Sequence, residues 1–190
     1  NSINGEVKIP GINGLKYKIN ASLNFRNNNS GSYTGQGVFS ANPTTESTGS
    51  ISYSNTLNWA IENLLTYDRT FADKHQINIV GLYSAEQNKY TRTYVSAKNI
   101  PADQFQFYNL GQALGEKTVD PGQQYYELSG LISYMGRIMY SYDNRYMLSV
   151  AVRSDGSSRL AEGHKWHTYP AISAGWNLAN ESFLKDINEI

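Results

Sequence analysis

Hydrophobic and polar residues alternate with a period of two along much of the chain. Between Leu15 and Arg26 every odd position is apolar, and every even position is Lys, Asn, Ser or Arg. Because successive side chains of a β-strand point to opposite faces, this pattern predicts a strand with one apolar and one polar face. Similar alternation, less regular in places, predicts six strands in all: 15–26, 51–67, 75–90, 127–142, 145–154 and 167–178.

The predicted connections alternate between long and short. Long loops follow the first and third strands, and a polar, glycine-containing loop at 155–166 follows the fifth, whereas 68–74 and Asp143–Asn144 are short turns. Successive connections of an antiparallel meander fall at opposite ends of the sheet, so all long loops would share one end. This asymmetry, with predicted strands long enough to cross a bilayer, is typical of transmembrane β-barrels.

We therefore predict an all-β chain, an antiparallel up-and-down meander of about six long strands that forms a section of a large transmembrane β-barrel wall. Aromatic residues near the predicted strand ends, such as Tyr67, Tyr142 and Tyr90, agree with interfacial girdles. The alternative is a soluble carbohydrate-binding β-sandwich rather than one continuous meander. A sandwich would bury these residues against a second sheet: Ile132, Tyr134, Tyr140, Leu148, Val150 and Trp176.

Composition narrows the possibilities further. The 190 residues include 16 basic and 16 acidic ones, without a basic run, so no nucleic-acid surface is expected. The absence of Cys excludes disulfides and thiolate metal sites, and no apolar run is long enough for a transmembrane helix. The chain begins at Asn1 without a signal-peptide pattern, which suggests a mature chain or an excised piece.

Catalytic motifs are not evident. The chain has no nucleophile elbow, P-loop or dinucleotide fingerprint. Its three histidines are His75, His164 and His167; the last two share a segment with Asp155 and Glu162, which could suggest a metal site, but a polar surface loop is the simpler interpretation. We predict no enzyme activity, no metal and no cofactor.

A family resemblance begins at Leu131. The segments "SYMGRIMYSYDNRYMLSVAVRSDGSSRL" and "WHTYPAISAGWNLANESFLKD" resemble the barrel of SusC/RagA-type TonB-dependent outer-membrane transporters. The whole chain resembles this family loosely, and 58–87 and 131–186 resemble it closely. Leu160 replaces the Phe that is more usual at this position in the family, a minor departure. The matching positions are Ser133, Tyr134, Gly136, Arg137, Tyr140, Tyr142, Arg145, Tyr146, Arg153, Asp155, Gly156, Ser157, Ser158, Arg159, Trp166, Pro170, Gly175, Trp176, Glu181, Phe183 and Leu184.

The resemblance implies a function. It implies a bacterial outer-membrane importer of oligosaccharides or peptides, energised by TonB, in contact with membrane lipid and covered by a SusD-like lipoprotein. Family members are much longer, so residues 1–190 would be a partial barrel domain without the plug domain or the TonB box. A siderophore or corrinoid receptor of the same superfamily is the alternative, and the "DGSSR" to "GW" stretch argues against it.

The predicted faces assign side chains to two environments. If the apolar faces meet lipid, the polar side chains would line the lumen, where most would bond to the plug or to neighbouring strands: Lys16, Lys18, Arg26, Glu62, Arg137, Arg145 and Arg153. Arg153, Asp155 and Arg159 are expected to bond within the loop base. Substrate contacts are expected from aromatic residues of the long loops, although each could instead pack its loop: Tyr33, Phe39, Tyr94, Phe105, Phe107, Tyr108 and Trp166.

Overall fold

The chain folds into one antiparallel sheet. The computed structural model describes residues 1–38, 45–181 and 183, and no α-helix occurs among them. The strands are β1 (Ser2–Lys8), β2 (Leu15–Thr34), β3 (Thr48–Phe71), β4 (His75–Lys98), β5 (Lys117–Val119), β6 (Tyr125–Tyr142), β7 (Tyr146–Ser157) and β8 (Trp166–Trp176). Short 3-10 helices are η1 (Asp103–Phe105), η2 (Leu110–Gln112), η3 (Pro121–Gln123) and η4 (Leu178–Asn180). No helix of the described part has the length and apolar character to cross a membrane.

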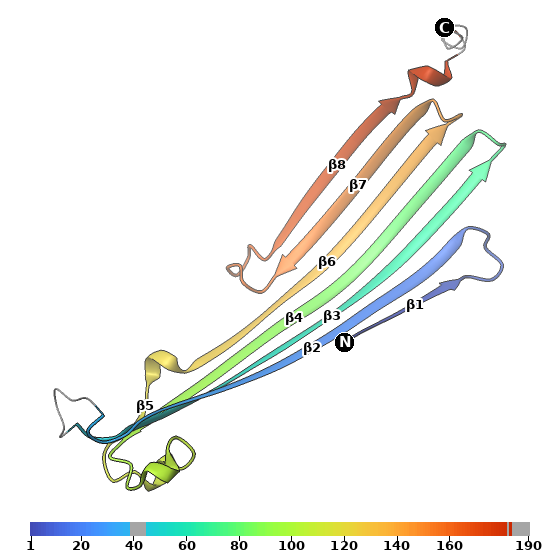
Figure 1. Cartoon of the computed structure of the whole chain (residues 1–190). Helices are drawn as coiled ribbons and strands as arrows, with labels where there is room; N and C mark the ends of the chain where they lie inside the picture. Colours follow the sequence, from blue (N-terminus) through green and yellow to red (C-terminus); the bar gives the residue numbers. More distant parts are fainter. Residues whose placement is uncertain (39–44, 182, 184–190) are drawn as a thin grey trace, which may run out of the picture. The chain divides into compact units, whose positions relative to one another are not determined.

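Neighbouring strands of the sheet follow chain order, as Figure 1 shows. The order is β1-β2-β3-β4-β6-β7-β8, with the short β5 paired to β4. The predicted meander is therefore confirmed. The sandwich alternative is wrong, because the described strands form a single sheet and Val150 and Trp176 remain 45% and 55% exposed.

Several predicted strand boundaries were wrong. β2 continues to Thr34 and β4 to Lys98, well past the predicted ends at Arg26 and Tyr90. The segment 27–34, "NNNSGSYT", lacks apolar alternation, but its backbone is part of the sheet. The predicted six strands also missed β1, whose apolar positions are interrupted by Gly5, and the three-residue β5.

The strand register fixes the two faces of the sheet. Ile138 lies opposite Val150, which lies opposite Ile172, and directly paired residues share a face. The next row along β6 pairs Arg137 with Ala151, on the other face. β1 and β2 show the same separation, because Val7 pairs with Tyr17 and Lys8 pairs with Lys16. The alternation in the sequence thus produces an apolar face and a second face that is more polar.

The short turns have the backbone geometry that tight hairpins require. Asp143 and Asn144 both have φ of 52°, as expected for a two-residue type I′ turn. Gly14, between β1 and β2, has φ of +90°, and a Cβ there would collide with the backbone carbonyl of Asp68. Only glycine fits this position without backbone movement.

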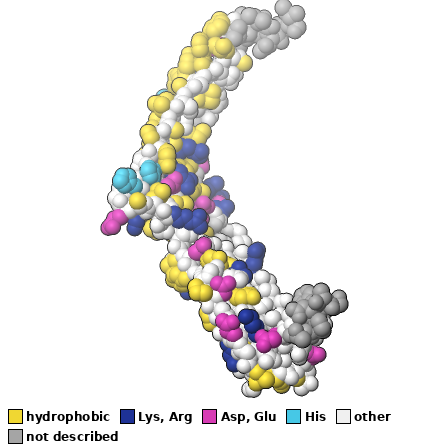
Figure 2. All heavy atoms as spheres, turned by 90° about the vertical axis from the view of Figure 1, so that its left-hand side faces the viewer, with side chains coloured by type: hydrophobic (Ala, Val, Ile, Leu, Met, Phe, Trp, Pro, Cys, Tyr) yellow, Lys and Arg dark blue, Asp and Glu magenta, His cyan; other side chains and the backbone are white. Residues whose placement is uncertain are grey.

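Two compact units divide the chain. Unit 1 comprises Asn1–Leu23, Trp59–Gln87 and Ser129–Ile190, and unit 2 comprises Asn24–Asn58 and Asn88–Leu128. Among the described hydrophobic residues of unit 1, only Val80 and Ala85 are buried, whereas Ile172 is 76% exposed. Figure 2 shows hydrophobic side chains in a band along its upper part, with few charged groups among them. The described residues of unit 1 therefore form no covered apolar core.

Unit 2 contains a small core of its own. Ala97, Ile100 and Ala113 are buried, and Tyr33, Phe105 and Leu110 pack against them. Ser47 fixes this cluster, since its hydroxyl accepts a hydrogen bond from the Ile100 amide at 2.7 Å and donates one to the Ile100 carbonyl at 3.2 Å. The loop after β4 therefore folds back onto the strands of this unit.

Candidate functional site

The structure relocates several aromatic residues that were predicted in loops. Tyr33 lies near the end of β2, Tyr94 within β4, and Trp166 begins β8. The prediction that these three lie outside strands was wrong, because the strands extend beyond their apolar segments. Phe105 lies in η1, and Phe107 and Tyr108 follow it. Phe39 lies outside the described residues.

Most of these aromatics gather on one face of unit 2. Tyr33 and Phe105 pack against the small core, and the Tyr33 hydroxyl donates to Asp103 Oδ1 at 2.5 Å. The rings of Phe107 and Tyr108 lie 4.3 Å apart. Tyr33 and Phe105 therefore help to hold the loop against the strands. Tyr108, in contrast, is 76% exposed and its ring is accessible from solvent.

Tyr94 and Trp166 lie elsewhere. Tyr94 is three residues before the buried Ala97 on β4, so its side chain projects from the opposite face. In unit 1, Trp166 pairs with Gly156, and its ring stacks on Tyr134 with a centroid separation of 5.9 Å. A stacked aromatic at the loop end of an apolar face is typical of an interfacial girdle. Within unit 2, Tyr94 therefore lies on the face opposite to that of Tyr33 and Phe105, while Trp166 belongs to unit 1.

The "RSDGSSR" motif builds the end of β7. Arg153 Nε donates to both carboxylate oxygens of Asp155, at 2.8 and 3.0 Å, and Arg153 Nη2 donates to Ser133 Oγ on β6 at 3.2 Å. Asp155, Gly156 and Ser157 belong to the strand, so the prediction that the loop begins at Asp155 was wrong. Asp155 and Gly156 pair with both β6 and β8, and Ser157 pairs with β6, so all three residues extend β7.

The loop itself starts beyond β7, and two serines shape its base. Ser158 Oγ accepts from the Gly130 amide at 2.8 Å, and Ser157 Oγ accepts from the Arg159 amide at 3.3 Å. The first bond attaches the loop to the adjacent strand β6, and the second links the last residue of β7 to the loop. The conformation of the loop base is therefore stabilised by hydrogen bonds both to β6 and to the end of β7.

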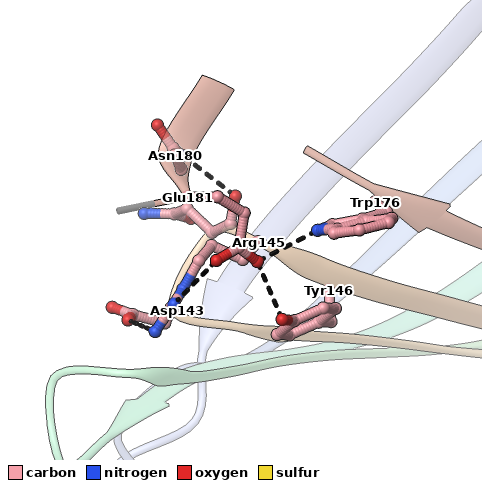
Figure 3. Close-up of polar contacts among 7 residues, drawn as sticks. Asp143, Arg145, Tyr146, Trp176, Asn180 and Glu181 are labelled. Carbon is pink, nitrogen blue, oxygen red and sulfur yellow. Dashed lines mark hydrogen bonds and ion pairs between the residues drawn. The ribbon is translucent and has the colours of Figure 1, made fainter. Parts of the chain in front are cut away.

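A carboxylate cluster lies at the short-turn end of unit 1 (Figure 3). Glu181 Oε1 accepts from the Tyr146 hydroxyl at 2.7 Å and from Trp176 Nε1 at 3.0 Å. Glu181 Oε2 lies 3.3 Å from Arg145 Nη1, and Arg145 Nη2 lies 2.5 Å from Asp143 Oδ2. The hydrogen bond from Tyr146 is the main cause that lowers the pKa of Glu181 below its usual value, followed by that from Trp176.

This cluster ties the segment after β8 to the β6–β7 turn. Asn180 Nδ2 adds a bond to the Asn144 carbonyl at 3.0 Å. The sequence marked Arg145, Tyr146, Trp176 and Glu181 as motif positions but assigned them no common contact. The position of Glu181, five residues after Trp176 at the end of a strand, was the one signal in the sequence for a contact between these two. The contacts of Glu181 with Arg145 and Tyr146 depend on the fold.

The histidines do not form a metal site in the described part of the chain. No group of three or more His, Cys, Asp or Glu side chains there is close enough to hold a metal ion. His167 lies in β8 opposite Asp155, and His75 Nδ1 is 2.7 Å from the Tyr140 hydroxyl. His75 thus has a hydrogen-bond partner in the sheet.

Comparison with curated proteins gives relatives of one kind. TonB-dependent receptor P3 of Formosa agariphila is 29% identical over 179 residues, which are 94% of this chain and 17% of the receptor. Receptor P39 of the same organism is 31% identical over 129 residues, 68% of this chain and 12% of P39. TonB-dependent receptor SusC of Bacteroides thetaiotaomicron is 47% identical over 58 residues, 30% of this chain and 6% of SusC. No family model matches the chain.

Solved structures share the fold. A structure of the RagAB peptide transporter has a TM-score of 0.80 at 17% sequence identity. The match covers 97% of this chain and 20% of the transporter chain. RagAB in the open-open state gives a TM-score of 0.79, covering 95% of this chain and 20% of that one. The chain spans about a fifth or less of the length of the proteins it matches. With the sheet order and motif geometry above, these matches show that the chain belongs to the SusC/RagA-type TonB-dependent transporters and forms a section of their barrel wall.

Proposed function

We propose that the protein to which these residues belong imports nutrients across the bacterial outer membrane. The carrying observation is the apolar face of unit 1, which β6, β7 and β8 share in register and which no described residue covers. In water such a face would be unfavourable, whereas in a bilayer it is the expected outer surface of a barrel. Residues 1–190 contribute wall strands, loops and turns to this transporter.

The imported substrate is an oligosaccharide or a peptide in this proposal. Support comes from the relatives, since one is named SusC and the matched structures are of a peptide transporter. A SusD-like lipoprotein would cover the long-loop end, and TonB would supply energy through parts of the protein outside these residues. Transport then proceeds by gated binding and release, without a catalysed reaction.

The polar face of the wall would meet the plug domain. Arg137 and Asn78 each have a buried side-chain atom, Nε and Oδ1, without a hydrogen-bond partner among the described residues. Unpaired buried polar atoms are costly, so a partner from another part of the protein is expected. This supports the sequence-based expectation that Arg137 bonds to the plug.

Single-cysteine labelling tests the orientation. Ala161, in the loop between β7 and β8, and Lys74, in the turn between β3 and β4, are exposed and lie at opposite ends of the meander. Cysteines placed there in the full-length protein would be labelled with a membrane-impermeant maleimide. We expect Ala161→Cys to react on intact cells and Lys74→Cys only after the outer membrane is opened; equal labelling on intact cells contradicts the proposal.

A further inference from the structure

Arg92 of unit 2 projects from the face of β4 opposite to the buried Ala97, and among the described residues only uncharged groups hydrogen-bond to its side chain. Arg92 Nε donates to Ser52 Oγ at 3.2 Å, and Arg92 Nη2 donates to Gln123 Oε1 at 2.8 Å. The ion pairs of the described residues do not include Arg92. Its guanidinium is therefore oriented, and no carboxylate of the described residues forms an ion pair with it.

The nearby carboxylate is committed to other donors. Asp120 Oδ1 accepts from the Gly122 amide at 2.8 Å and so caps η3, while Asp120 Oδ2 accepts from Gln123 Nε2 at 3.1 Å. The second bond leaves Gln123 Oε1 turned towards Arg92. Asp120 thus orients the neutral amide of Gln123, which in turn positions Arg92. Asp120 itself forms no ion pair with Arg92.

Aromatic rings accompany this guanidinium. The Arg92 guanidinium carbon lies 6.0 Å from the centre of the Tyr125 ring, and Tyr125 is 43% exposed. Tyr90 and Tyr94 precede and follow Arg92 by two residues on β4, so they share its face. Lys89 faces the other way and lies over the Tyr126 ring, 5.7 Å from its centre.

We propose that Arg92 binds a carboxylate of the imported substrate, with Tyr125 stacking beside it. Of the five N–H groups of an arginine, Ser52 and Gln123 occupy two, which leaves three for a ligand. A planar guanidinium is suited to bidentate binding of a carboxylate. This inference rests on the proposed importer and specifies its substrate class as acidic: a peptide with a free carboxyl end, or an oligosaccharide containing a uronate.

A purely structural role explains the arrangement less well. Bonds to Ser52 and Gln123 could be made by a neutral donor, and holding a charge half-buried without a counter-charge costs free energy. A bound carboxylate would supply that counter-charge. The fixed geometry would also reduce the ordering cost of binding.

The test uses the purified full-length protein and two pairs of probes in calorimetric titrations. One pair is N-acetyl-tetraalanine with a free or an amidated carboxyl end; the other is trigalacturonate and its methyl ester. The acidic member of one pair should bind about tenfold to a hundredfold more tightly than its neutral partner. The pair that discriminates identifies the source of the carboxylate, peptide or uronate.

Variants separate binding from structure. Arg92→Gln should remove the difference between acidic and neutral probes, and Gln123→Glu should do the same by placing a carboxylate against the guanidinium. Lys89→Gln, which removes a charge from the opposite face of the same strand, should leave the difference unchanged. Folding of each variant is checked by the labelling pattern at Ala161 and Lys74.

Two results would overturn the inference. One is equal binding, or no binding, of both members in both probe pairs. The other is an acidic preference that survives in Arg92→Gln. Either can occur in a protein with the expected labelling pattern, so failure of this inference is distinct from failure of the importer proposal.

Discussion

Units 1 and 2 share strands β2, β3, β4 and β6, but their apolar side chains have different surroundings. In unit 1 the large apolar side chains of β6, β7 and β8 lie open on one face, as Ile138, Val150 and Ile172 show. In unit 2 the loop after β4 packs Ile100 and Leu110 against one face of that unit's strands. One unit relies on its surroundings to cover its apolar face, and the other covers much of it with its own chain.

The sequence of β2 shows where this change occurs. Its odd positions are apolar up to Phe25, and then become Asn27, Asn29 and Gly31. Glycine at 31 leaves room for the ring of Phe107, which would overlap a Cβ at that position. In the proposed transporter, the end of this apolar alternation at Phe25 would mark the limit of the lipid-facing part of β2.

The largest expected effect is on the open face of unit 1. Val150→Lys should prevent assembly into the outer membrane, since a Lys on the lipid face of a barrel costs up to about 2–4 kcal/mol near the midplane. Ser149→Lys is the matched control, because the neighbouring side chain projects from the other face. Assembly is measured by the shift between folded and heated protein on electrophoresis. Equal assembly of both variants would refute the lipid-facing assignment.

A smaller effect is expected in the core of unit 2. Ile100→Ala should cost about 2 kcal/mol, the lower end for such a truncation, because this cluster is small. Loop opening would become about thirtyfold more populated, and tryptic cleavage at Lys98 and Lys117 correspondingly faster. Leu114→Ala, at a side chain that is 74% exposed, serves as the control and should cleave at the original rate. Unchanged cleavage of Ile100→Ala would show that the cluster does not hold the loop.

Two glycines allow a more sensitive comparison of the units. Gly31→Ala should loosen the unit 2 loop by about 1 kcal/mol, because Phe107 must move aside. Gly136→Ala should change stability by less than about 0.5 kcal/mol, because a Cβ there would have no atom within 4 Å. Denaturant unfolding and the same tryptic assay measure both. A larger loss for Gly136→Ala would mean that its face is packed in the assembled protein.

Sequence alone was sufficient for the features that depend on local pattern. The period-two alternation at 15–26 gave the faces of β2 correctly, and Asp143–Asn144 gave a tight turn. The extension of β2 to Thr34 could not be predicted, because polar residues there are held by backbone pairing with a neighbouring strand. The fold of the loop onto unit 2 also depends on distant contacts, such as the one between Ser47 and Ile100.

The site was less predictable than the fold. Tyr90, Arg92 and Tyr94 can be placed on one face from their spacing. What distinguishes Arg92 is the neutral partner Gln123, which lies 31 residues away in sequence and is oriented by Asp120. Such an arrangement follows from the path of the loop and leaves no pattern in the sequence.

The smallest expected effect concerns the pH dependence of the Glu181 cluster in unit 1. Because Tyr146 and Trp176 lower the pKa of Glu181, its stabilising contribution is fully present above the unfolded value of about 4.3 and is lost as pH falls through the lower folded pKa. Fluorescence of Trp176, which donates to Glu181, should therefore change only in acid. Glu181→Gln should abolish that transition and weaken the attachment of 177–181 at neutral pH, while Asp73→Asn, in the separate β3–β4 turn, should leave it intact. A transition that persists in Glu181→Gln would mean that another group titrates, and the carboxylate would then be a passive part of the turn.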